Sequence, residues 1–190
     1  MAIVPVCVGD GLPAGLRVVY RPSDLSPGGA ILDREGADVG SALRRTKASC
    51  DYEDPLPVVR YDAQAGERSL DLLRWGLVPC WAKDIKVGFA NINAKAEGIE
   101  NRPAFREAFQ RRRCLVRVDN FYEWKKTATG KQPYAVALAY RRLMALAGLW
   151  ENWRSPAGDW IRSFAIITTE PNELCAQLHN RMPAVLRPES

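Results

Sequence analysis

Three polar residues of types that move protons or form paired hydrogen bonds stand far apart in this sequence: Asn93, Glu123 and His179. Glu123 lies between aromatic neighbours, and partial desolvation raises a carboxyl pKa toward the range where proton transfer is efficient. His179 is the single histidine of the chain, and imidazole exchanges protons near neutral pH. The Asn93 amide donates and accepts hydrogen bonds at once. Each also has a structural interpretation: a polar strand face, an outward-facing strand glutamate and a structural histidine.

The chain has five cysteines, namely Cys7, Cys50, Cys80, Cys114 and Cys175. No two form a CxxC pair and their number is odd, which disfavours a zinc site or a disulfide framework. We therefore expect free thiols, with no metal and no cofactor. The apolar surroundings of Cys80, Cys114 and Cys175 predict small core residues. Cys175 and His179 could share a helix face, which leaves an internal-cysteine hydrolase as an alternative.

Composition narrows the function class only moderately. With 47% apolar and 26% charged residues, the 190-residue chain fits a globular protein, and its composition indicates neither disorder nor a membrane protein. No signal peptide is evident, so we expect a cytoplasmic protein. The 27 Lys and Arg against 22 Asp and Glu give a net charge of +5, which permits nucleic-acid binding without establishing it.

Two regions differ in pattern. Residues 1–50 are rich in Gly, Pro, Asp and Ser and predict a divergent, loop-rich segment, whereas residues 51–190 carry dense strand patterns. Strands are predicted over 56–61, 70–78, 114–118, 121–125, 134–139, 143–150, 163–168 and 182–186. Helices are predicted over 103–112 and 171–178. Strands dominate, so we expect an α+β fold with a mostly antiparallel, bent or barrel-like sheet and a few short flanking helices.

Four segments resemble the SOS-response-associated peptidase family and follow the family's order: Leu73–Ala82 (LRWGLVPCWA), Asn91–Glu97 (NINAKAE), Phe121–Lys126 (FYEWKK) and His179–Pro183 (HNRMP). Shorter similar segments lie between them, at Pro103–Arg106, Arg113–Val116, Ala147–Glu151 and Ile166–Thr169. The similarity runs from about residue 55 to about residue 186.

The resemblance implies a protein of the DNA damage (SOS) response that binds single-stranded DNA containing abasic sites. Family members form a covalent link to the abasic aldehyde through the amine and thiol of an N-terminal cysteine, and the family name implies peptidase chemistry beside this lyase-type chemistry. By this resemblance Asn93 holds the reacting groups, while Glu123 and His179 move protons.

The family's opening Met-Cys-Gly-Arg is absent here, because Ala2 follows Met1. Cys7 is the only early cysteine, and it could serve as the nucleophile only after removal of six residues. Crosslinking and peptidase activity are therefore open. A non-covalent DNA-binding protein or an inactive fragment is the alternative, and the C-terminus also looks short for the family.

The resemblance and the residue types together predict DNA contacts at Trp75, Trp81, Lys95, Arg106, Arg113, Lys125 and Lys126. Aromatic rings stack on unpaired bases and cations track phosphates, so binding should weaken with salt. We expect one of the two tryptophans to be exposed and the other to be buried. Lys95 stands where the family tends to have an arginine, which predicts a less oriented phosphate contact. We expect a monomer with no membrane partner.

Overall fold

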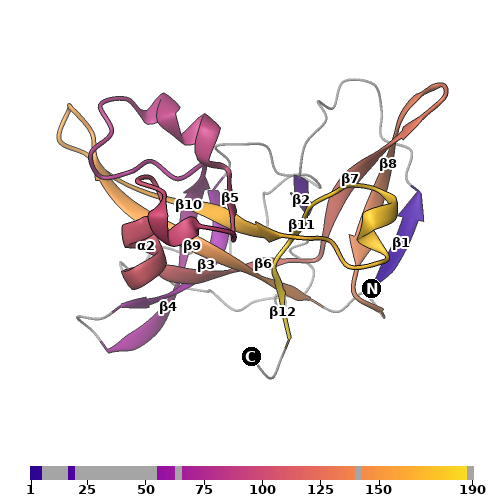
Figure 1. The fold of residues 1–190 in the computed structure, drawn as a ribbon. Helices are drawn as coiled ribbons and strands as arrows, with labels where there is room; N and C mark the ends of the chain where they lie inside the picture. The colour runs from indigo at the N-terminus through magenta and orange to yellow at the C-terminus, as the bar shows by residue number, and fades with distance from the viewer. Residues whose placement is uncertain (6–16, 20–54, 63–65, 140–142, 188–190) are drawn as a thin grey trace.

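The computed structural model describes residues 1–5, 17–19, 55–62, 66–139 and 143–187 (Figure 1). Strands form most of this part, with short helical turns around them, as the sequence predicts. No helix in these ranges is long and apolar enough to cross a bilayer.

The larger sheet has eight strands and wraps into a barrel. Its members are β3 (Pro55–Asp62), β4 (Glu67–Trp75), β5 (Asn93–Lys95), β6 (Arg113–Val118), β9 (Met144–Arg154), β10 (Trp160–Thr169), β11 (Met182–Pro183) and β12 (Val185–Leu186). Strand β10 pairs with both β4 and β9, so the path β10-β4-β3-β6-β9 returns to its start and closes. The closing β4–β10 ladder is parallel, while the other ladders along the path are antiparallel.

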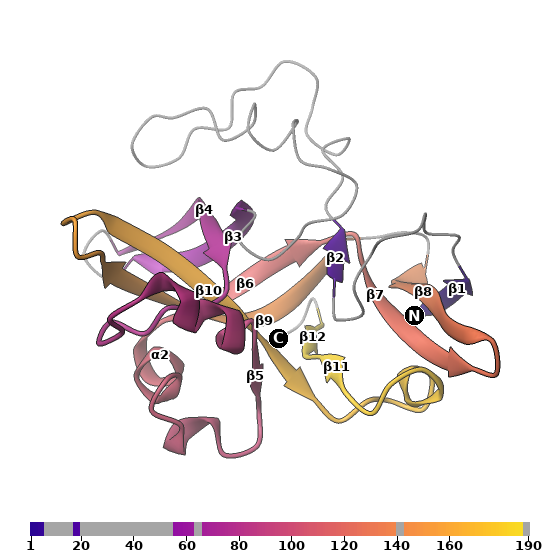
Figure 2. The same cartoon turned by 90° about the horizontal axis from the view of Figure 1, so that it is seen from above.

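The smaller sheet has the order β1-β8-β7-β2, with β1 (Ala2–Pro5), β2 (Arg17–Val19), β7 (Asn120–Thr127) and β8 (Gly130–Ala137). Only Asp119 separates β6 from β7, so the chain passes directly from the barrel into this sheet. The β7–β8 hairpin projects away from the barrel (Figures 1 and 2).

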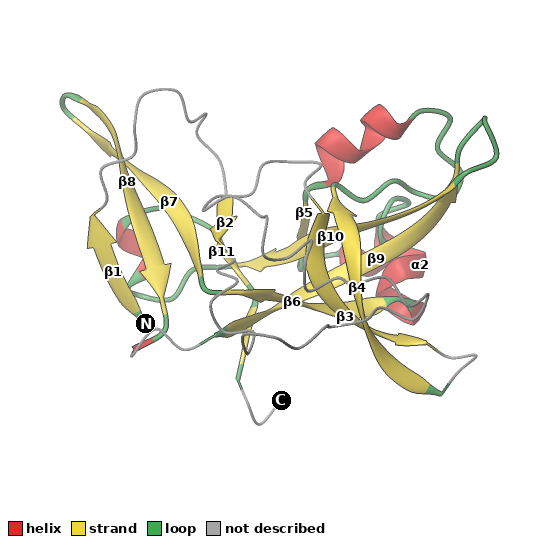
Figure 3. Ribbon diagram, turned by 180° about the vertical axis from the view of Figure 1, so that it is seen from behind, coloured by secondary structure: helices red, strands yellow, loops and turns green. Residues whose placement is uncertain are grey.

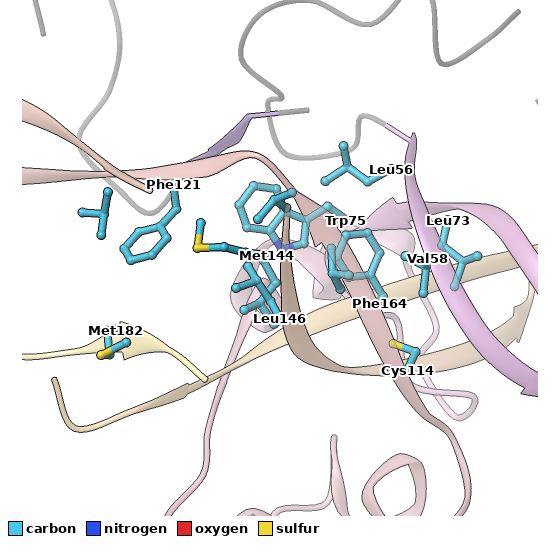
Figure 4. Close-up of a cluster of buried hydrophobic side chains, with 14 of the residues drawn as sticks. Leu56, Val58, Leu73, Trp75, Cys114, Phe121, Met144, Leu146, Phe164 and Met182 are labelled. Atoms are coloured by element: carbon cyan, nitrogen blue, oxygen red, sulfur yellow. The ribbon is translucent and has the colours of Figure 1, made fainter. Parts of the chain in front are cut away.

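Alternating burial along the strands builds the core. In β9 and β4, inward residues alternate with partly exposed ones, as expected for strands with one face packed. The inner cluster gathers side chains from both sheets, including Leu56, Trp75, Phe121, Met144 and Phe164 (Figure 4). Cys175, from the segment after β10, also belongs to it. A second cluster lies on the other face of β10, where Ala165 packs with Leu77, Ala94 and Phe105.

The helices are shorter than the sequence predicts. The segment 103–112 contains one α-helix, α2 (Arg106–Arg111), with Phe105 and Ala108 buried in the second cluster. The 3-10 turn η3 (Ile99–Asn101) packs beside it, and a further 3-10 turn, η2 (Ile85–Asn91), precedes β5.

The prediction of a helix over 171–178 is wrong, because only the 3-10 turn η5 (Cys175–Gln177) forms there. The Asn172 carboxamide accepts a hydrogen bond from the Cys175 backbone N–H at 2.9 Å. Such local side-chain bonds compete with a continuous helix.

Candidate functional site

Asn93 opens β5, which runs parallel to β10. Asn93 pairs with Ile166, and Lys95 pairs with Thr168. Paired residues share a face of the sheet, so Asn93 is directed to the Ile166 side, where the inner cluster lies, while Ala94 packs into the second cluster. The backbone carbonyl of Ile92 anchors the strand by accepting hydrogen bonds from the Trp75 indole and from the Ile166 N–H, both at 3.0 Å.

The Asn93 Oδ1 is buried and accepts no hydrogen bond from the described part of the chain. A buried acceptor without a donor costs free energy. With respect to the described residues, this amide therefore has an acceptor position open to a ligand.

Glu123 lies on the inward face of β7, two residues after the buried Phe121. Its side chain is only 7% exposed, and burial raises the pKa of its carboxyl to about 7, opposed by a hydrogen bond from the Trp124 backbone N–H. Among the side chains that the structure describes, no cation forms an ion pair with it. The expected desolvation is confirmed, and the carboxyl can gain or lose a proton near neutral pH.

Cys175 approaches Glu123 from η5. Burial, followed by the nearby Glu123 carboxylate, raises the pKa of the Cys175 thiol, and the side chain is 1% exposed. A thiol with a raised pKa carries little thiolate and is a poor nucleophile. The expected core position is confirmed, and the internal-cysteine hydrolase loses its support.

His179 follows η5 and is exposed. Its backbone N–H donates to the Cys175 carbonyl at 3.1 Å, which ties it to the turn beside Glu123. Its ring Nδ1 accepts from the Arg181 N–H at 3.2 Å rather than from the Cys175 thiol. The imidazole thus keeps a fixed position at the surface.

Arg181 was not among the predicted site residues, although it belongs to the quoted segment His179–Pro183. Its guanidinium donates to both carboxylate oxygens of Glu97 at 2.9 Å and also to the Thr168 carbonyl. The hydrogen bonds from Arg181 lower the pKa of Glu97. This fork joins the His179 turn to β10 and to the chain just beyond β5, where Glu97 serves as a structural salt-bridge partner.

The two tryptophans divide as expected, so Trp75 must be removed from the DNA-contacting set. Trp75 is fully buried, lies parallel to Phe164 with ring centroids 6.3 Å apart, and donates its indole N–H to Ile92. It has no ring face left for a base. Trp81 is 60% exposed and keeps that possibility.

The predicted cationic contacts are all exposed, but they do not gather in one place. Lys95 lies on the same strand as Asn93. Arg106 begins α2 and Arg113 begins β6, whereas Lys125 and Lys126 lie near the tip of the β7–β8 hairpin, at the other end of the molecule (Figures 1 and 2). A DNA strand would meet them at separate points.

One further prediction was wrong, and one exposed aromatic residue was not considered. Cys80 is exposed, not a core residue, because it follows Pro79 into the turn after β4. Phe89 in η2 is 51% exposed, with the Arg74 guanidinium 5.8 Å from its ring centroid. Cys7 lies outside the described residues.

Residues 37–190 match the sequence model of the SOS response associated peptidase (SRAP) family. The chain belongs to the SRAP family. The match begins earlier than the similarity recognised in the sequence, which started at about residue 55.

Curated relatives agree with this assignment. The abasic site processing protein YoqW of Bacillus subtilis (strain 168) is 45% identical over 122 residues, covering 64% of this chain and 54% of that protein. The abasic site processing protein HMCES of Gallus gallus is 31% identical over 151 residues, covering 67% and 45% respectively. This SRAP chain therefore spans about half the length of the curated relatives it matches.

Solved structures share the fold. A crystal structure of a Bacteroides thetaiotaomicron protein superposes with a TM-score of 0.72 at 25% identity, covering 80% of this chain and 68% of that one. A phage-related protein from Bordetella bronchiseptica gives a TM-score of 0.60 at 25% identity, covering 91% and 78%. The barrel-like α+β fold expected for the SRAP chain is confirmed.

Proposed function

We propose that this SRAP domain binds single-stranded DNA at abasic sites and reacts with their aldehyde through a site built from Asn93, Glu123 and His179. The observation that carries the proposal is Glu123, a buried carboxyl with a pKa of about 7 and no cationic partner among the described side chains. The relatives named abasic site processing proteins supply the substrate class.

The contacts described above support a shared site. Glu123 influences the Cys175 thiol, and the Cys175 carbonyl holds the His179 N–H. The Arg181 fork ties the same turn to the segment that follows β5. Asn93 is directed toward the inner cluster, to which Cys175 also belongs.

The reaction needs proton transfer at two points. When an amine attacks the aldehyde carbon, a proton must leave the nitrogen, and a proton must reach the hydroxyl that departs as water when the imine forms. A carboxyl that titrates near pH 7 can accept the first proton and return it to the leaving oxygen. The Asn93 amide can orient the sugar of the abasic nucleotide, and the exposed His179 imidazole can pass protons between the site and solvent.

The residue that supplies the attacking amine is where this sequence departs from the family pattern, because Ala2 follows Met1 in place of cysteine. A polypeptide that begins at Met1 or Ala2 offers an α-amine with no thiol on the same residue, and Lys95 offers a side-chain amine on β5. Either amine forms a reversible imine. A stable thiazolidine needs the nitrogen, Cα, Cβ and sulfur of one N-terminal cysteine.

The test is borohydride trapping of the imine on abasic single-stranded DNA. We expect Glu123→Gln to slow trapping by at least about 100-fold, the usual scale for loss of a general acid–base group. The matched control is Glu67→Gln, at the exposed start of β4, which should trap at the wild-type rate. Equal rates for both variants would refute the role of Glu123.

Preference for single strands is tested separately. Binding should be tighter for single-stranded than for duplex DNA of the same sequence and should weaken with salt, because phosphate contacts release counterions. Equal affinities at moderate salt would contradict the proposal. We also propose that the domain acts as a monomer, which light scattering with and without DNA would test.

A further inference from the structure

A cavity of about 400 Å³ lies away from the candidate site, lined by Leu72, Asn152, Trp160 and Arg162. It forms where β10 separates from β4. The β4–β10 ladder contains only the pairs at Ser163 and Phe164, whereas β10 stays paired with β9 back to Trp160. The β3–β4 and β9–β10 hairpins consequently splay apart at this end of the barrel (Figures 1 and 3).

The cavity is lined by one aromatic ring, that of Trp160, and by the polar side chain of Asn152. The Trp160 side chain is 63% exposed, and the Arg154 guanidinium lies 5.8 Å from its ring centroid. The Asn152 Oδ1 is buried and has no hydrogen-bond donor among the described residues. An exposed indole beside an unused amide acceptor suits a planar ligand with hydrogen-bond donors on its edge.

The charge around the cavity favours an anion. Arg162 contacts Asp71 at 3.8 Å, and the same carboxylate is held by Arg60 at 2.6 Å. Arg60 also lies 3.8 Å from Asp62, so these two guanidinium groups face two carboxylates, and the Arg154 guanidinium beside Trp160 supplies the excess positive charge. A phosphate group near this rim would be attracted rather than repelled.

We propose that this cavity takes one unpaired nucleobase, with its phosphate near Arg162, from single-stranded DNA whose abasic site occupies the Asn93–Glu123–His179 site. The inference rests on the proposed function. Ring stacking on Trp160 and the Asn152 amide would hold the base, and the cavity volume falls within the range of sites that hold small ligands.

The spacing along β10 sets the length of DNA required. Trp160 lies six residues before Ile166, the partner of Asn93, which corresponds to about 20 Å of strand. Fully stacked DNA, with a rise of about 3.4 Å per nucleotide, would need about six nucleotides to reach the cavity from the abasic site, and an extended strand would need about half as many.

The experiment measures affinity for abasic oligonucleotides of two lengths, about 2 and about 20 nucleotides, chosen to fall short of and to exceed that distance in any conformation. Trp160→Ala should weaken binding of the longer strand about 5- to 100-fold, the range for loss of one base stack, and leave the shorter strand unchanged. Trp160→Phe is the matched control, because it keeps an aromatic ring and should retain most of the affinity. Asn152→Ala should weaken only the longer strand as well.

Equal effects of Trp160→Ala on both lengths, or no effect on either, would overturn the assignment. A free nucleotide is the other source of the same chemistry. If dAMP alone binds in a Trp160-dependent way while the longer strand gains no affinity, the assignment to DNA is overturned. Loss of imine trapping in Glu123→Gln with no effect of Trp160→Ala would refute this cavity alone. Failure of the wild-type protein to bind either oligonucleotide would refute the proposed function together with it.

Discussion

Burial of Glu123 should make the protein less stable as the pH rises. Its folded-state pKa is about 7, raised from 4.5, so the folded protein holds this proton more tightly than the unfolded chain. The stabilising contribution is complete below pH 4.5 and is lost as the pH rises through 7. Between pH 4.5 and pH 7, each unit of rising pH lowers the contribution of Glu123 to the free energy of unfolding by about 1.36 kcal/mol.

Between pH 5 and pH 8 this single carboxyl should reduce the free energy of unfolding by about 2.5 kcal/mol, from the two pKa values and the linkage relation. Glu123→Gln removes the titration while keeping the size of the side chain. The loss of stability from pH 5 to pH 8 should therefore be about 2.5 kcal/mol smaller in Glu123→Gln than in the wild type.

The assay is urea unfolding of wild type, Glu123→Gln and the exposed control Glu67→Gln at both pH values. Other groups titrate in this interval, but they are common to all three proteins and cancel in the comparison. The control should lose as much stability as the wild type. An equal loss in Glu123→Gln would show that Glu123 has an ordinary pKa, and the proton-transfer argument would then lose its basis.

Three other predictions concern the positioning of the site. Gly88→Ala should lower the free energy of unfolding, measured with urea, by about 1–3 kcal/mol, because a Cβ at this position would lie 2.6 Å from the Gly76 carbonyl oxygen. An unchanged urea midpoint would refute the close packing of these two backbone segments. Arg181→Lys should lose the two-pronged contact with Glu97 and slow imine trapping about tenfold, while the free energy of unfolding changes by less than about 1 kcal/mol. A large loss of stability without a change in the trapping rate would indicate a purely structural role for Arg181. A polypeptide beginning at Met1 should give no heat-stable crosslink to abasic DNA on a denaturing gel, whereas one beginning at Cys7 regains an amine and a thiol on one residue; a heat-stable band whose mass shows an intact Met1 or Ala2 terminus would refute this chemistry.

Most strands could be predicted from the sequence because their signal is local. Alternating apolar residues mark β3, β6 and β9 within a few positions of their observed ends, and they need no knowledge of their partners. Helices were predicted less well. The pattern over 171–178 is helical, but the Asn172 side chain bonds to the Cys175 backbone and leaves a single turn.

The sequence by itself also determined the types of the reactive groups, and it correctly predicted the desolvation of Glu123. The burial comes from the inward face of β7, however, because the adjacent Tyr122 and Trp124 point to the other face of the strand. The sequence could not decide which of Trp75 and Trp81 is buried, since both flank the same short segment. That outcome depends on Phe164, which reaches Trp75 only through the parallel β4–β10 ladder that closes the barrel.

The tertiary structure alone joined Arg181 to Glu97, 84 positions away, and opened the cavity beside Trp160. Neither feature leaves a local pattern, because each depends on where strands distant in sequence meet or separate. The chemical types of the residues and the alternation of apolar and polar side chains can be seen within a few consecutive positions of the sequence. Burial, ion pairing and cavities depend on the closure of the barrel, which only the packing of the whole domain decides.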